Sequence, residues 1–271
     1  MSGSQKMYFK GNAAKSRIIR LVLEQCEDCR ETLLFDYGCG QAKYWPKVLD
    51  DHPGLSLVYY DPARKSMEQA KANLAGKQAR ALADPLAESS LNVDFVISFS
   101  VFEHVWDRQG YLRTAFRHLK PGGVLFLNYD DGHFRNNISL NRPWRSVSQI
   151  KEFLFNLTAR PLARLGILSH YQRRVKRDTA EAMVTEAGFA VEEVFYSNLP
   201  SLKGLYGELE EFGWSEEIRR EYAQKWQELE EFLNSRLLRD EEVERLGDRA
   251  NLWPHTLSRT LVLRKPEGEV D

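Results

Sequence analysis

Long apolar runs are missing from this sequence of 271 residues. No hydrophobic stretch approaches the roughly 20 residues that a membrane-spanning helix needs. The first residues, Met-Ser-Gly-Ser-Gln-Lys, lack the apolar segment of a secretory signal. We therefore expect a cytoplasmic protein without a membrane partner.

Cysteine is scarce too, with three residues in the whole chain. Cys26 and Cys29 form a CxxC pair, a spacing that can hold zinc or carry out redox chemistry. Zinc needs two further ligands at a matching spacing, and the sequence has no second CxxC and no HxxxH. We therefore predict no metal site and interpret both residues as ordinary thiols at a helix end.

Charge is nearly balanced overall, with a formal net charge of −1, but it is unevenly distributed. Residues 133–177 hold ten Lys and Arg against one acidic residue, and residues 207–248 hold fourteen acidic residues against six basic ones. Such separation along a chain usually has a structural or binding cause. Hydrophobic content of 42% and charged content of 28% are ordinary for a globular protein.

Continuous apolar runs of strand length alternate with segments of helical periodicity. Strands are expected at residues 33–35, 55–60, 79–82, 95–99, 124–128, 190–196 and 260–263. Helices are expected at residues 62–74, 106–119 and 179–187. Uninterrupted apolar strands are typical of a parallel sheet that is buried on both faces. The pattern predicts one doubly wound α/β domain over residues 1–271, with a mostly parallel sheet.

Two stretches interrupt this alternation and are too long to be ordinary connections of roughly 4–6 residues. We predict two inserted segments with structure of their own that form a cap over the expected substrate pocket. One is the basic insertion at residues 133–177, and the other is a helical acidic insertion at residues 200–255.

Acidic residues and glycines gather where the expected strands end. Gly38 and Gly40 follow the first strand directly after Asp36, and Asp61 and Asp84 follow the next two strands. Ligands of open parallel sheets bind at the carboxyl ends of the strands. Glycine lets the backbone approach a ligand closely, and carboxylates there can accept hydrogen bonds from ribose hydroxyls and an adenine amino group. The set therefore predicts an adenosine ligand with free ribose hydroxyls.

The glycine pattern separates two kinds of adenosine. A dinucleotide fold would have GxGxxG here, with its pyrophosphate at a helix N-terminus, but the third glycine is replaced by Lys43. Asp36 would also repel a pyrophosphate, whereas it suits an ammonium group. An adenosine that carries an amino acid is S-adenosylmethionine (SAM).

The same segments resemble the class I SAM-dependent methyltransferases. "LLFDYGCGQA" is similar to their glycine-rich motif, with Ala42 in place of the usual third glycine. "LVYYDPA" resembles the ribose-binding motif, "ALADPLA" the adenine-side segment and "VDFVISFSVFEHV" the fourth-strand motif. "RHLKPGGVLFLN" is similar to the fifth-strand signature, and "AEAMVTEAGFAVEEV" extends the match to the sixth strand.

This resemblance implies a seven-stranded sheet whose last strand is antiparallel. It also implies the cofactor-binding residues, by position: Asp36, Gly38, Cys39 and Gly40 at the methionine part, Asp61 and Pro62 at the ribose, Asp84 and Pro85 at the adenine, and Ser100 and Val101 under the sulfonium. In addition, the N-terminal Tyr8 and Lys10 are candidates to fold over the cofactor.

Catalysis is less determined by the sequence. Methyl transfer is an in-line displacement, so positioning of the acceptor supplies much of the catalysis. A hydroxyl acceptor also has to lose its proton, and histidine is the usual base near neutral pH. His104 after the fourth strand and His133 after the fifth are the candidate bases, and an amine acceptor needs neither.

The acceptor is expected to be a small molecule that is methylated on oxygen or nitrogen, such as a sugar, a nucleotide-linked compound or a natural-product intermediate. Basic side chains of the first insertion, Arg142, Arg145, Arg173 and Arg174, predict an anionic acceptor. The acidic insertion could instead neutralise them, within the chain or across a homodimer. Two other functions stay open: a SAM-binding regulatory subunit, and an RNA-modifying enzyme, which the near-neutral charge disfavours.

Overall fold

The computed structural model describes residues 13–25, 31–130, 177–198 and 257–268, together with Val175, Ser215 and Glu221. These ranges form a seven-stranded sheet with the strand order β3-β2-β1-β4-β5-β7-β6. Both predicted insertions lie largely outside the described residues, as do Tyr8, Lys10, Cys26 and Cys29. No described helix has the length and apolarity needed to cross a membrane.

The sheet is parallel except for its last strand. β1 pairs in parallel with β2 and β4, and β7 runs antiparallel between β5 and β6, which confirms the predicted arrangement. The strands are β1 (Thr32–Tyr37), β2 (Leu55–Tyr60), β3 (Ala79–Ala81), β4 (Val93–Phe99), β5 (Leu119–Asp130), β6 (Ala190–Asn198) and β7 (Leu257–Arg264).

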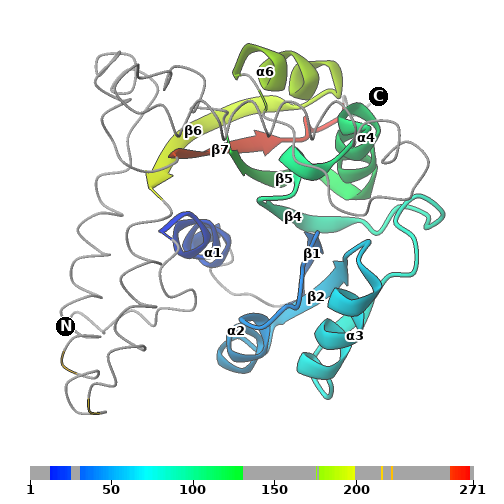
Figure 1. Cartoon of the computed structure of the whole chain (residues 1–271). Coiled ribbons are helices and arrows are strands. Elements are labelled where there is room, and N and C mark those ends of the chain that lie inside the picture. Colours follow the sequence, from blue (N-terminus) through cyan, green and yellow to red (C-terminus); the bar gives the residue numbers. More distant parts are fainter. Residues whose placement is uncertain are drawn as a thin grey trace, which may run out of the picture.

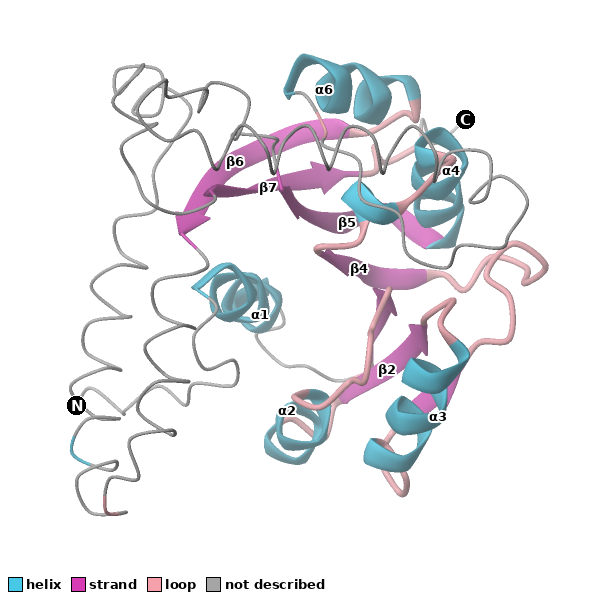
Figure 2. Cartoon of the chain, viewed as in Figure 1, coloured by secondary structure: helices cyan, strands magenta, loops and turns pink. Residues whose placement is uncertain are grey.

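Helices cover both faces of the sheet, in the doubly wound manner expected (Figures 1 and 2). They are α1 (Ala13–Gln25), α2 (Trp45–Asp51), α3 (Arg64–Asn73), α4 (Arg108–His118) and α6 (Arg177–Glu186), with a short 3-10 helix η1 (Phe102–His104). Buried residues of α1, α2 and α3 share one hydrophobic cluster, and those of α4 and α6 share the other.

Alternation along β1 decides which face receives its acidic residue. Leu34 packs in the cluster of α1 and α2, whereas Phe35 and Tyr37 pack in the cluster of α4. Successive side chains of a strand point to opposite faces. Asp36 therefore shares the face of Leu34 and is directed toward α1 and α2.

Several element boundaries differ from the sequence-based expectation. β1 continues through Asp36 and Tyr37, so the acidic residue lies within the strand and not after it. β5 begins at Leu119 and includes the Lys-Pro-Gly-Gly segment, whereas we expected this strand only at residues 124–128. Here Gly122 donates to the Lys265 carbonyl and Lys265 donates to the Gly123 carbonyl, so backbone pairing after β7 extends over this turn-like sequence.

Candidate active site

The pocket opens where the winding of the sheet reverses. From β1 the chain proceeds outward to β2 and β3 and then returns to β4 on the other side of β1. The parallel ladder of β1 and β4 stops at the pair Asp36 and Ile97, whereas that of β1 and β2 continues to Tyr37 and Tyr60. A cavity of about 480 Å³ lies at the carboxyl ends of these strands, the usual ligand site of this fold class.

Most of the predicted cofactor residues line this one cavity. They are Asp36, Gly38, Cys39, Gly40, Asp61, Pro62, Ser100 and Val101, joined by the candidate base His104. Asp84 and Pro85 are not among the lining residues. His133, Arg142, Arg145, Arg173 and Arg174 lie outside the described residues.

The segment after β1 adopts a backbone that few side chains tolerate. The φ angles of Gly38, Gly40 and Ala42 are 101°, 56° and 52°. A Cβ on Gly38 would lie 2.3 Å from Cγ2 of Val101, whereas one on Gly40 would meet no atom within 4 Å. Gly38 is therefore required by packing, while Gly40 keeps a surface of the cavity open. Ala42, at the third glycine position, has the left-handed conformation that explains the usual glycine.

Asp61 joins two of the segments that surround the cavity. Its Oδ2 accepts a hydrogen bond from the Gly40 amide at 2.9 Å, and its Oδ1 accepts one from the Ala63 amide at 2.9 Å. Each carboxylate oxygen keeps a second lone pair. The side chain is only partly buried, so it can still accept hydrogen bonds from a ligand diol.

Asp36 is the buried charge of the site. The side chain is 3% exposed, and its Oδ2 accepts a hydrogen bond of 2.6 Å from Nε1 of Trp45. Among the described residues, its Oδ1 is buried and has no hydrogen-bond partner. Burial raises the pKa of Asp36 to about 6, an increase that the Trp45 hydrogen bond and the charge of Lys15 oppose.

Sequence reasoning missed Trp45 and Lys15, although both line the cavity. Lys15 lies on α1 with its Nζ 5.0 Å from the Phe99 ring centroid. No motif marks it, because its position depends on how α1 packs against the sheet. Trp45 had a signal, a tryptophan followed by proline nine residues after Asp36, which is the start of α2.

The segment after β4 holds His104 at the cavity. Ser100 has a φ of 52°, and its amide donates to the Asn128 carbonyl at 2.9 Å. The buried Arg108 donates from Nε to the Phe102 carbonyl at 3.0 Å, which fixes η1 against the start of α4. His104 is half-buried at the end of η1 and lines the cavity, so the turn that Arg108 holds also carries this histidine.

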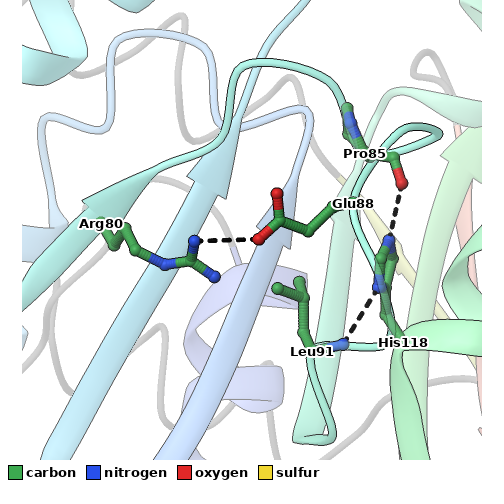
Figure 3. A network of polar contacts seen from close by, with 5 residues as sticks. All are labelled: Arg80, Pro85, Glu88, Leu91 and His118. Atoms are coloured by element: carbon green, nitrogen blue, oxygen red, sulfur yellow. Dashed lines mark hydrogen bonds and ion pairs between the residues drawn. The ribbon is translucent and has the colours of Figure 1, made fainter.

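Asp84 and Pro85 belong to a connection that is bound to the end of α4 (Figure 3). Nε2 of the buried His118 lies 2.9 Å from the Pro85 carbonyl, and Nδ1 accepts from the Leu91 amide at 3.3 Å. These partners assign the neutral tautomer with its proton on Nε2. Arg80 and Glu88 form an ion pair beside them, so the segment is anchored at several points.

Cys39 is a thiol that lines the cavity. Among the described residues, no group of three or more His, Cys, Asp or Glu side chains is arranged to hold a metal ion. Burial, reinforced by Asp36 and Asp61, raises the pKa of the Cys39 thiol far above its usual range. The thiol therefore stays protonated at neutral pH and is a poor nucleophile.

The two carboxylates and the open surface at Gly40 fit the amino acid and adenosine parts of SAM. The buried Asp36 oxygen without a partner suits an ammonium group, and a pyrophosphate would be repelled by it. The open surface at Gly40 leaves room for close approach of a ligand. The partly exposed Asp61 suits a ribose diol.

Comparisons with known proteins agree with a SAM-binding site in this cavity. A family model described as a methyltransferase domain matches residues 12–194. The ubiquinone biosynthesis O-methyltransferase of Rhizobium rhizogenes is 33% identical over 99 residues, which cover 35% of this chain and 39% of that protein. The chain thus matches about two fifths of the length of such curated relatives.

Solved structures share the fold at low identity. A cyclopropane synthase of Mycobacterium tuberculosis is 17% identical, with a TM-score of 0.55 over 92% of this chain and 83% of that one. Phosphoethanolamine N-methyltransferase 2 of Haemonchus contortus is 15% identical, with a TM-score of 0.55 over 92% of this chain and 52% of that one. Together with the family match, the sheet order and the strand-end cavity, these likenesses show that the chain belongs to the class I, Rossmann-like SAM-dependent methyltransferases.

Proposed function

We propose that this enzyme transfers the methyl group of SAM to a hydroxyl oxygen of a small-molecule acceptor. The observation that carries the proposal is the position of His104, which lines the same cavity as Asp36 and Asp61. A hydroxyl becomes a good nucleophile when a base takes its proton, and histidine is suited to this near neutral pH. The curated relatives named O-methyltransferases support oxygen as the acceptor atom.

Different residues of the cavity would bind different parts of SAM. Asp36 would hold the ammonium of SAM, and Lys15, which also lines the cavity, would suit its carboxylate. Asp61 would hold the ribose, and Ser100 and Val101 would lie beneath the sulfur. SAM supplies an electrophilic methyl group on a positively charged sulfur.

His104 would accept the proton of the acceptor hydroxyl. Because η1 is fixed by Arg108, the imidazole is held at the cavity without the entropy cost of ordering a loop. The fold itself does not choose the acceptor atom, since solved neighbours include an N-methyltransferase and a cyclopropane synthase. An anionic acceptor held by Arg142, Arg145, Arg173 and Arg174 stays a prediction for residues outside the described ranges.

The test is incubation of the protein with SAM and pools of hydroxylated or amino-bearing metabolites, with products heavier by one methylene read by mass spectrometry. If the acceptor atom is a hydroxyl oxygen, the products are methyl ethers. It also expects His104→Ala to lower turnover by roughly 10²–10⁴ while S-adenosylhomocysteine (SAH) binding stays unchanged. Methylated amines as the products, or a normal rate of His104→Ala at saturating acceptor, would contradict it.

A further inference from the structure

The hydrogen bond between Trp45 and Asp36 joins two almost fully buried groups. Trp45 is 2% exposed and Asp36 is 3% exposed, and Nε1 lies 2.6 Å from Oδ2. An indole N–H only donates, so its partner has to be an acceptor. Hydrogen bonds to an ionised acceptor are shorter and roughly twice as strong as neutral ones. The contact therefore favours the ionised form of Asp36 inside a desolvated site.

The two oxygens of this carboxylate have different surroundings. Oδ2 is held by the indole, whereas Oδ1 is buried and has no hydrogen-bond partner among the described residues. A buried polar atom without a partner is costly in a folded protein and calls for an explanation. Because Asp36 lines the cavity, a donor on the ligand is the natural partner for Oδ1.

The position of the indole is itself set by the glycine-rich segment. Trp45 is the first residue of α2, and its amide donates to the Ala42 carbonyl at 3.3 Å. Its ring packs in the same cluster as Val48 and Leu49 of α2. The backbone turn and the helix core thus both hold the donor, and a flexible side chain does not have to be ordered when a ligand binds.

Other charged or titratable groups surround Asp36 from every neighbouring element. Lys15 of α1 favours its ionised form, and Asp61 at the end of β2 disfavours it. Cys39 and Tyr111 each have a pKa raised in part by Asp36, and His104 lines the same cavity. Trp45 differs from all of these because it acts through a direct hydrogen bond and carries no charge that changes with pH.

We propose that Trp45 is a positioning residue of the cofactor site, which holds Oδ2 of Asp36 and so presents Oδ1 to the ammonium group of SAM. The inference rests on the methyltransferase assignment above and goes beyond it. It makes recognition of the ammonium depend on an aromatic residue that belongs to neither the glycine motif nor the acidic residues.

The test compares two probes by calorimetry between pH 5 and 7. SAH carries the ammonium group, and 5′-methylthioadenosine has the same adenosine and sulfur but no amino acid. For Trp45→Phe, we expect SAH affinity at pH 7 to fall about tenfold, the loss of one hydrogen bond to a charged group. The pH below which SAH affinity declines should also move upward, while affinity for methylthioadenosine should stay within about twofold.

Further variants separate a positioning role of Trp45 from a general loss of structure. Val48→Ala removes a buried side chain from the same helix and cluster, and it should leave both affinities and the pH profile unchanged. Asp36→Asn should weaken SAH binding, and adding Trp45→Phe to it should cause little additional loss, because Trp45 acts through Asp36. If Trp45→Phe does not fold, the isosteric benzothienylalanine at position 45 removes the N–H and keeps the ring shape.

Equal weakening of SAH and methylthioadenosine, or an unshifted pH profile in the Trp45 variants, overturns the positioning role while leaving the methyltransferase assignment in place. If the wild-type protein binds neither probe, the assignment of this cavity to SAM is wrong and the positioning role falls with it.

Discussion

The Gly40 amide donates to Oδ2 of Asp61 across 2.9 Å, and this bond joins the loop after β1 to the end of β2. The acidic residue therefore has two tasks, since it shapes the glycine loop and remains partly exposed in the cavity. The two motifs are 21 residues apart in the chain, yet neither can be changed without affecting the other.

Asp36→Asn is expected to stabilise the ligand-free protein at alkaline pH. Burial raises the pKa of Asp36 from 3.8 to about 6, so the folded state holds this proton more tightly than the unfolded state. The unfolding free energy therefore falls as the pH rises through this window, by up to about 3 kcal/mol. Urea unfolding of both proteins at pH 8 should show the variant to be more stable.

The advantage of Asp36→Asn should vanish near pH 4, where the wild-type carboxyl is protonated. Asp94→Asn serves as the control, because Asp94 accepts from the Leu33 amide and pairs with Lys120 near the surface. It should be destabilised and not stabilised. A wild-type protein that is more stable than Asp36→Asn at pH 8 would refute the buried-charge account.

Gly38→Ala should mainly lower the stability of the protein, whereas Gly40→Ala should mainly lower its affinity for SAM. The new Cβ of Gly38→Ala lies 2.3 Å from Val101 at a φ of 101°, so we expect a loss of roughly 2–4 kcal/mol in unfolding free energy. Gly40→Ala places its Cβ in open space. It should lose about 1 kcal/mol of stability but at least tenfold in SAM affinity.

Thermal unfolding and calorimetry on the same two variants check this contrast. A Gly40→Ala protein that binds SAM as tightly as wild type would mean that no ligand approaches the backbone at that point. A Gly38→Ala protein of normal stability would show that Val101 moves aside.

The connection that carries Asp84 and Pro85 should loosen in acid. Burial lowers the pKa of His118 below its ordinary value of 6.5, so the neutral ring is the form that the fold favours. Its stabilisation is complete above pH 6.5 and is lost as the pH falls through the folded-state pKa. A protonated ring would also turn its Nδ1–H toward the Leu91 amide, which is itself a donor.

Hydrogen exchange of the Leu91 amide is the local readout of this effect. Exchange corrected for its intrinsic pH dependence should speed up below pH 6.5 in the wild-type protein. In His118→Gln it should be fast at every pH, with a loss of about 1–3 kcal/mol in unfolding free energy. Protection of Leu91 that is independent of pH in the wild-type protein would rule out the histidine anchor.

The apolar pattern of the sequence predicted the sheet well, because continuous apolar runs mark buried parallel strands. It also placed Asp36, the glycines and Asp61 at one edge of the sheet, where the cavity lies, because the carboxyl ends of parallel strands converge there. It missed Trp45 and Lys15, whose roles depend on tertiary contacts of α1 and α2 and not on a local pattern. It also ended β1 before Asp36, because a charged residue reads as the end of an apolar strand.

The central claim is that the cavity between β1, β2 and β4 binds SAM through Asp36 and Asp61. Calorimetric titration of the wild-type, Asp61→Ala and Asp94→Ala proteins with SAM and with NADH tests it most directly. Asp94 is the matched control, since it also accepts a backbone amide, Leu33, but at the opposite end of the strands. We predict micromolar SAM binding by the wild-type and Asp94→Ala proteins, at least tenfold weaker binding by a folded Asp61→Ala protein, and no binding of NADH. Unchanged SAM affinity in Asp61→Ala, or binding of NADH without SAM, would contradict the account.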